Sequence, residues 1–143
     1  MCGIVGFTGK QNAAPILLEG LTRLEYRGYD SAGIAVREGD KPPVIVKAKG
    51  RLKNLYEKTN DGTAVIGACG IGHTRWATHG EPSENNAHPH CSDDLNVIGV
   101  HNGIIESYQQ IREKLTRKGY RFHTETDTEA LIKYIDYYYK KYN

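Results

Sequence analysis

The sequence lacks the features that mark disulfide-rich, membrane-spanning or nucleic-acid-binding proteins. Its three cysteines, Cys2, Cys69 and Cys91, are an odd number without CxxC spacing, which argues against a disulfide framework. No apolar run approaches the roughly 18 residues of a membrane helix. Nineteen basic against 17 acidic residues leave a net charge of +2, so the chain carries no electrostatic footprint for nucleic acid. We therefore expect neither a membrane nor a nucleic acid as a partner.

The amino terminus also lacks targeting signals. Its first six residues, Met-Cys-Gly-Ile-Val-Gly, contain neither the basic region nor the long apolar stretch of a signal peptide. The first glycine is at position 3 rather than 2, which does not fit the myristoylation pattern. We expect a cytoplasmic protein. With 143 residues, 38% of them hydrophobic, the chain has material for one domain with a real core.

Hydrophobic patterning and turn residues predict an α+β domain of short strands and separate helices. Strands are expected at 2–7, 31–36, 44–49 and 95–100. A first helix should be capped by Asn12 and end at Gly28, and a second should span 52–58. Two further helices should follow the boxes Ser107-x-x-Gln110 and Thr126-x-x-Glu129. The last of them carries one stripe, formed by Leu131, Ile135, Tyr138 and Tyr142.

Residues 70–96 differ from the rest, because they are polar, rich in histidine and without clear periodicity. We expect a long functional loop there. Within it, His88-Pro89-His90-Cys91 offers three possible metal ligands in four residues. Zinc sites combine two separated ligand pairs, and the sequence shows no second pair. We therefore expect no metal, and we interpret these histidines as packed or loop-stabilising residues.

Cys2 stands out by its position. If Met1 is removed, the α-amine of Cys2 lies beside its own thiol, and such an amine titrates near pH 7.7–8.0, close to ideal for a general base. A terminal amine paired with a thiol is a known way to activate a nucleophile. The alternative is a small residue that merely follows the start codon. Position alone leaves both open.

Three other features could complete a site around such a nucleophile. Asn102-Gly103 offers a side-chain amide and a backbone N–H to an oxyanion, although Asn-Gly is also a common turn. Arg75 and Asp127 suit the carboxylate and ammonium of a free amino acid. Their alternatives are a surface charge and a favourable acid in the first turn of a helix. Trp76 is either a core anchor or a wall over a small polar substrate.

Together these residues resemble class II glutamine amidotransferases, the N-terminal-nucleophile type. The resemblance covers nearly the whole chain in five ordered blocks, of which the second and third are long and specific. The blocks are residues 1–6, 24–33, 73–82, 101–106 and 124–129. It implies the fold of N-terminal-nucleophile hydrolases, an α-β-β-α sandwich of two antiparallel sheets, here incomplete at its C-terminal end.

The resemblance also assigns roles to individual residues. Cys2 would attack the side-chain amide of L-glutamine to form a γ-glutamyl thioester, with Asn102 and Gly103 holding the oxyanion. Arg75 and Asp127 would bind the α-carboxylate and α-amine of glutamine. A loop over the pocket would be shaped by Trp76, Thr78 and His79, and the surroundings of the nucleophile would be supported by Arg27 and Gly28. No metal and no organic cofactor is implied.

Finally, the resemblance implies more protein than these residues. Residues 2–143 would be the N-terminal part of a type 2 amidotransferase domain, normally followed by two sugar-isomerase domains. In the whole enzyme, the ammonia released from glutamine would be used to convert fructose 6-phosphate to glucosamine 6-phosphate. We expect that enzyme to be a homo-oligomer. Fructose 6-phosphate would bind only through those domains. One alternative is a non-catalytic remnant that binds glutamine or a partner chain. A hydrolase of peptides is disfavoured, because Arg75 and Asp127 fit a free amino acid better.

Overall fold

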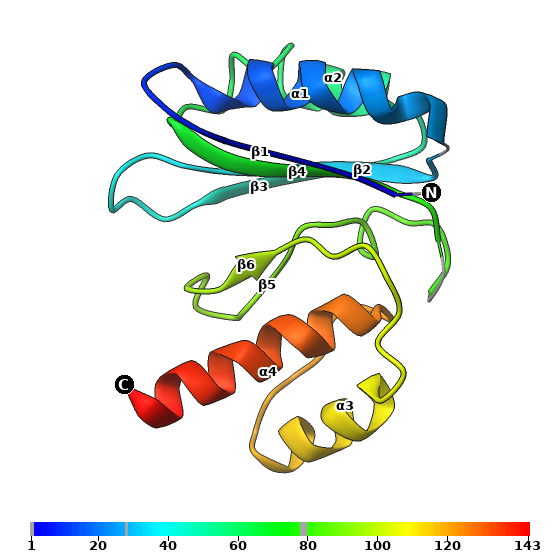
Figure 1. Cartoon of the computed structure of the whole chain (residues 1–143), viewed down its shortest axis with the longest axis vertical. Coiled ribbons are helices and arrows are strands. Elements are labelled where there is room, and N and C mark those ends of the chain that lie inside the picture. Colours follow the sequence, from blue (N-terminus) through cyan, green and yellow to red (C-terminus); the bar gives the residue numbers. More distant parts are fainter. Residues whose placement is uncertain (1, 28, 78–79) are drawn as a thin grey trace.

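The larger of two sheets organises the chain. The computed structural model describes residues 2–27, 29–77 and 80–143, so Gly28, Thr78 and His79 lie outside the described residues. Four antiparallel strands form this sheet in the order β1-β4-β2-β3. Their bounds are β1 (Gly3–Thr8), β2 (Ser31–Arg37), β3 (Val44–Lys49) and β4 (Cys69–Arg75). One face is covered by two helices, α1 (Ala13–Leu24) and α2 (Leu52–Lys58) (Figure 1).

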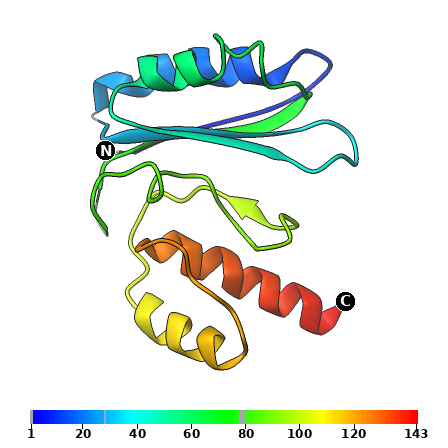
Figure 2. The same cartoon turned by 180° about the vertical axis from the view of Figure 1, so that it is seen from behind.

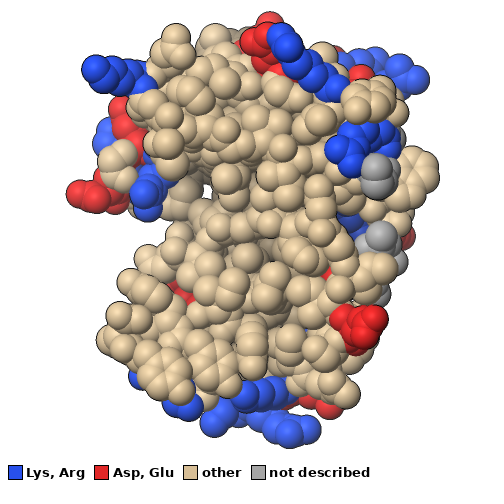
Figure 3. All heavy atoms as spheres, in the orientation of Figure 1, with Lys and Arg blue, Asp and Glu red and all other residues tan. Residues whose placement is uncertain are grey.

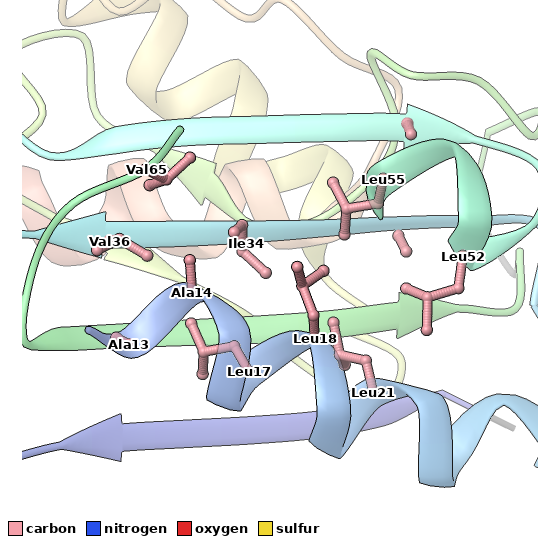
Figure 4. Close-up of a cluster of buried hydrophobic side chains, with 12 residues drawn as sticks. Ala13, Ala14, Leu17, Leu18, Leu21, Ile34, Val36, Leu52, Leu55 and Val65 are labelled. Atoms are coloured by element: carbon pink, nitrogen blue, oxygen red, sulfur yellow. The ribbon is translucent and has the colours of Figure 1, made fainter. Parts of the chain in front are cut away.

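The main hydrophobic core lies between α1, α2 and this sheet (Figure 4). Leu17, Leu18 and Leu21 of α1 are fully buried against side chains such as Ile34 of β2. Fully burying one such leucine contributes about 1.5–3 kcal/mol. The apolar face of α1 is therefore the side that packs against the sheet. The α-helix ends at Leu24, before the expected Gly28, because the chain tightens into the 3₁₀ turn η1 (Glu25–Arg27).

The sequence analysis placed most of the central strand β4 in a polar loop, and the structure shows that this prediction is wrong. Its pattern is hidden by alternating glycines, which weaken a strand signal. These glycines admit α1 to the sheet: a Cβ on Gly70 would lie 2.8 Å from the Leu17 side chain, and one on Gly72 would lie 3.1 Å from that of Leu21. The glycines of β4 are thus explained by helix packing.

A small second sheet and two helices lie on the other face. β5 (His90–Cys91) pairs with β6 (Ile98–Gly99), which is shorter than the predicted strand 95–100. α3 (Tyr108–Arg117) and α4 (Asp127–Tyr142) lie beyond this pair. Seen from both sides, the layers follow the order helices, sheet, sheet, helices (Figures 1 and 2). This agrees with the expected α-β-β-α order of an α+β domain.

The two sheets approach each other closely at Gly33 of β2. A Cβ at this glycine would lie 2.0 Å from the backbone oxygen of His88, in the segment that leads into β5. That separation is far below van der Waals contact, so only glycine fits. Gly33 therefore sets the spacing between the two halves of the molecule.

The predicted stripe of α4 is not its buried face. Ile135 and Tyr142 are 46% and 73% exposed, whereas Lys133 and Asp136 are almost fully buried. The Lys133 ammonium pairs with Glu129 at 3.0 Å and with Asp93 at 3.3 Å. This side of α4 is therefore held to the turn between β5 and β6 by an ion pair, which hydrophobic periodicity could not reveal.

The surface shows a notch and a hollow between the two halves. Figure 3 shows charged side chains mainly around the margin of this face and a notch between the two halves at the left. A hollow of about 460 Å³ lies between residues 40–43 of the β2–β3 turn and residues 94–96 of the β5–β6 turn. Within the described parts of the chain, no helix combines the length and the apolar character that a membrane crossing needs.

Candidate active site

Segments far apart in the sequence meet around a second cavity, of about 530 Å³, at one end of the four-stranded sheet. It is lined by the start of β1, the end of β4, the loop after β6 and the start of α4. The lining residues are Cys2, Arg27, Arg75, Trp76, His88, His101, Asn102, Gly103, Ile104, Thr126, Asp127 and Thr128. Every residue of the predicted site that the structure describes is in this set. The other three, Gly28, Thr78 and His79, lie outside the described residues.

Cys2 is placed by strand pairing. Gly3 of β1 lies opposite Thr74 of β4, so Cys2 is carried to the end of β4. There the backbone N–H of Trp76 donates to the Cys2 sulfur at 3.2 Å, and the sulfur lies 3.6 Å from the Trp76 carbonyl oxygen. The half-buried thiol is therefore held at the rim of the cavity by the main chain that follows β4.

Asn102 is the second polar group beside Cys2. Its Nδ2 donates to the Cys2 carbonyl oxygen at 3.2 Å, and its Oδ1 lies 2.8 Å from His73 Nε2. Gly103 has a φ of +149°, at the edge of the range that favours glycine. Because β6 ends at Gly99, Asn102-Gly103 lies in the loop after the strand. The loop brings the amide to the nucleophile.

The alternative interpretation of Arg75 as a surface charge is wrong, because its side chain is only 3% exposed. Its Nη1 donates to the carbonyl oxygen of Glu81 at 3.1 Å, and its Nη2 to that of Gly80 at 3.0 Å. Asp30 lies 3.9 Å from Nη1 and also accepts the backbone N–H of Ala77. The guanidinium thus links the cavity to the chain that follows β4.

Asp127 and Trp76 stand at other sides of the cavity. Asp127 is the first residue of α4 and 4% exposed, and its Oδ2 accepts the backbone N–H of Ile105 at 2.8 Å. It therefore combines a favourable place in a helix's first turn with a place in the cavity wall. Trp76 is 55% exposed, so the core-anchor interpretation is wrong. An exposed ring at the cavity fits the wall interpretation.

Three buried histidines pack together at the cavity, and one of them, His88, lines it. The rings of His73 and His88 stack with centroids 4.0 Å apart, and His90 meets His88 edge-on at 4.6 Å. Burial lowers the pKa of His73 to about 4 and lowers the pKa values of His88 and His90 far below the usual range. All three imidazoles are therefore neutral at pH 7.

The histidines do not assemble a metal centre in the described part of the chain, which contains no group of three or more His, Cys, Asp or Glu side chains able to hold an ion. His90 Nε2 instead bonds Thr126 Oγ1 at 3.0 Å. Sequence reasoning gave no site role to His88 or His101, although both line the cavity. His101 directly precedes Asn102 in a matched block, and this adjacency was the available signal.

Comparisons with known proteins agree with this geometry. A family model described as "Glutamine amidotransferase domain" matches residues 43–141. The chain is 61% identical over 140 residues to a Clostridium tetani protein named glutamine–fructose-6-phosphate aminotransferase [isomerizing]. It is 54% identical over 142 residues to a protein of the same name from Thermus thermophilus. Both alignments cover 98% of this chain but only 23% of the relative, so the chain spans about a quarter of these relatives' length.

A solved structure gives the same result for the fold. The glutamine phosphoribosylpyrophosphate (PRPP) amidotransferase from B. subtilis, complexed with ADP and GMP, superposes with a TM-score of 0.76 and 30% sequence identity. The match covers 92% of this chain and 28% of that one. The layered α+β architecture is therefore that of an N-terminal-nucleophile amidotransferase, as expected.

Proposed function

The chain belongs to the glutamine amidotransferase domain family, and from this premise we propose that its cavity hydrolyses the side-chain amide of L-glutamine through a thioester on Cys2. One observation carries the proposal. The sulfur of Cys2, the amide of Asn102 and two buried, oppositely charged side chains, Arg75 and Asp127, line one cavity. A nucleophile, an oxyanion donor and a pair of amino-acid anchors are the parts that this reaction needs.

The chemistry proceeds in two halves. With Met1 removed, the α-amine of Cys2 accepts the thiol proton, and the thiolate attacks the side-chain amide carbon of glutamine. The oxyanion that forms accepts hydrogen bonds from Asn102 Nδ2 and the backbone N–H of Gly103. The tetrahedral intermediate collapses with loss of ammonia, to which the amine returns the proton. Water then attacks the γ-glutamyl thioester, releasing glutamate and restoring the thiol.

Recognition of glutamine rests on charge. We assign the α-carboxylate to Arg75, whose guanidinium can bind it through two parallel hydrogen bonds, and the α-ammonium to Asp127. Both side chains are nearly buried, where opposite charges attract more strongly than in water. An internal peptide residue has neither charge, which favours a free amino acid as the substrate. Trp76, with Thr78 and His79, is assigned to the cover of the pocket, and Arg27 with Gly28 to the surroundings of the nucleophile.

For the whole protein we propose the activity that the relatives' name describes. Residues 2–143 would form the N-terminal part of the amidotransferase domain, and further domains would transfer the ammonia to fructose 6-phosphate, yielding glucosamine 6-phosphate. Two observations support this proposal. The chain is 61% identical to the relative over 98% of its own length, and it corresponds to only 23% of the relative's length. We also propose that the full protein acts as a homo-oligomer in the cytoplasm.

The decisive experiment measures glutamate release from glutamine by the purified chain, with mass spectrometry confirming loss of Met1. Cys2→Ala should abolish release, whereas Cys69→Ala, which removes an exposed thiol outside the cavity, should leave it intact. Asn102→Ala should lower the rate by about 100-fold or more. Turnover by Cys2→Ala would refute the covalent mechanism. No release from the correctly processed chain would favour the non-catalytic alternative, which binds glutamine or a partner chain.

A further inference from the structure

His73 lies beside the candidate active site, where its ring contacts Asn102, the residue that donates a hydrogen bond to Cys2. It belongs to the central strand β4, is fully buried, and stacks on His88 with an angle of 12° between the ring planes. Its Nε2 lies 2.8 Å from Oδ1 of Asn102. A buried histidine is thus in direct contact with the proposed oxyanion donor, although the proposed mechanism gives it no task.

The direction of this hydrogen bond follows from the neighbours of Asn102. The oxygen and nitrogen of a carboxamide are distinguished by their partners. On one side, 3.2 Å away, is the carbonyl oxygen of Cys2, which can only accept, so the Asn102 nitrogen faces it. The Asn102 oxygen therefore faces His73, and His73 Nε2 must carry the hydrogen. Burial lowers the His73 pKa to about 4, so the other ring nitrogen, Nδ1, carries no hydrogen at pH 7.

We infer that His73 is a positioning residue, which fixes the Asn102 carboxamide so that its N–H₂ side, and not its oxygen, faces Cys2. The inference rests on the proposed function of Asn102. Without the Nε2 hydrogen, nothing at His73 opposes rotation of the amide by half a turn. A rotated amide would present oxygen to the developing oxyanion and repel it. His73 therefore acts on the rate of thioester formation and hardly on glutamine binding.

The surroundings of His73 suit this task. Its backbone is in the middle of the sheet, where His73 lies opposite Ile4 of β1 and Gly33 of β2. Its ring is fully buried and stacked on His88, which restricts its tilting. A donor held rigidly before the reaction needs no reorganisation when charge develops. The neutral ring also adds no positive charge beside the thiol.

The kinetic test compares two variants that differ in the donor. His73→Phe keeps a flat ring against His88 but removes the N–H, and we expect kcat for glutamine hydrolysis to fall about 10- to 100-fold while KM changes less than about twofold. His73→Gln offers an amide N–H near the original Nε2 position and should recover most of the loss. Unchanged kcat in His73→Phe, with the wild type active, would overturn the inference and leave the proposed function standing.

A double-variant cycle separates positioning from a general loss of structure. If His73 acts only through Asn102, adding His73→Phe to Asn102→Ala should lower kcat by less than about twofold more. A further loss as large as in the wild-type background would show that His73 acts elsewhere, and would overturn the inference.

A readout independent of turnover is the tautomer of His73. Nitrogen-15 spectra of the imidazoles should show hydrogen on Nε2 from pH 7 down to about 5, because the ring is neutral in that range. Hydrogen on Nδ1, or a charged ring at neutral pH, would overturn the assigned orientation of Asn102. A wild-type chain that releases no glutamate would overturn the proposed function, and the tautomer would still decide the orientation of the amide.

Discussion

Mild acid should destabilise this protein strongly, because three imidazoles are buried in neutral form. His73, His88 and His90 have pKa values lowered by burial, to about 4 for His73 and well below the ordinary value for the other two. In the unfolded chain each has a pKa near 6.5. As pH falls through that value, these histidines bind protons in the unfolded state but not in the folded state. The free energy of unfolding therefore decreases as pH decreases.

The expected size follows from the linkage relation. Between pH 7.5 and pH 5.5, one histidine with a pKa near 6.5 in the unfolded chain, and far lower in the folded one, removes about 1.4 kcal/mol. Three such groups remove about 4 kcal/mol, a large part of the roughly 5–15 kcal/mol that holds a typical domain. The carboxylates contribute little over this range, because those with resolved shifts, Asp93, Asp94 and Glu129, have lowered pKa values.

Urea unfolding followed by circular dichroism at pH 7.5 and pH 5.5 measures this difference. His73→Phe should reduce the fall by about one third, since one of three titrating groups is gone. His123→Gln is the matched control: its imidazole is exposed beside Asp93, so the fall should stay within about 0.5 kcal/mol of the wild type. Equal free energies of unfolding at the two pH values would refute the claim that these rings are buried and neutral.

Two further substitutions test the packing between layers. Gly33→Ala should lower the free energy of unfolding by about 3 kcal/mol, because the new methyl would lie 2.0 Å from the His88 carbonyl oxygen. Gly6→Ala, whose Cβ would meet no described atom within 4 Å, should change it by less than about 0.5 kcal/mol; equal effects in urea titrations would contradict the close approach. Lys133→Met should cost about 3–5 kcal/mol, because it leaves the buried Glu129 carboxylate without its partner at 3.0 Å. Wild-type stability of that variant in the same assay would show that the buried pair is dispensable.

The elements that could be predicted are those whose signal is local. The helix over Leu52–Lys58 and the strand over Val44–Lys49 have the expected bounds, because apolar spacing and flanking turn residues suffice to define them. β4 could not be predicted, since its glycines serve the packing of α1, which is separated from them in the sequence. The strand expected at 95–100 shrinks to Ile98–Gly99, because pairing with β5 spans only two residues.

The two capping boxes show the same limit. Thr126 accepts from the backbone N–H of Glu129 at 3.3 Å, as its box predicts. Ser107 precedes α3 at the expected place, but its side chain makes no cap hydrogen bond within the described residues. The sequence pattern is the same in both cases. The backbone differs: Thr126 is extended, whereas Ser107 has φ −94° and ψ 18°, which does not suit the bond.

The candidate site was predictable as a set of residues and not as an arrangement. The residues proposed to react with or bind glutamine lie in short motifs and could be named from the sequence, and those described line one cavity, whereas His88 and His101 of the same cavity were missed. The contacts that orient them could not be named. The bond from His73 to Asn102 joins β4 to the loop after β6, and the clamp of Arg75 on the Gly80 and Glu81 carbonyls depends on the path of a loop.

The pairing of the four-stranded sheet also determines when the parts of the site can come together while the chain is being synthesised on the ribosome. β2 and β3 can form their hairpin as soon as both have emerged, but β1 pairs with β4, and Gly3 meets Thr74 only after the intervening chain has been made. Closing so long a loop is slow compared with hairpin formation. Cys2 precedes its cavity neighbours Trp76, Asn102 and Asp127 in the chain, so they become available to it in that order. We expect the Cys2 thiol to remain exposed to solvent at least until the segment that carries Asp127 has been synthesised, with its reactivity set by solvent until then.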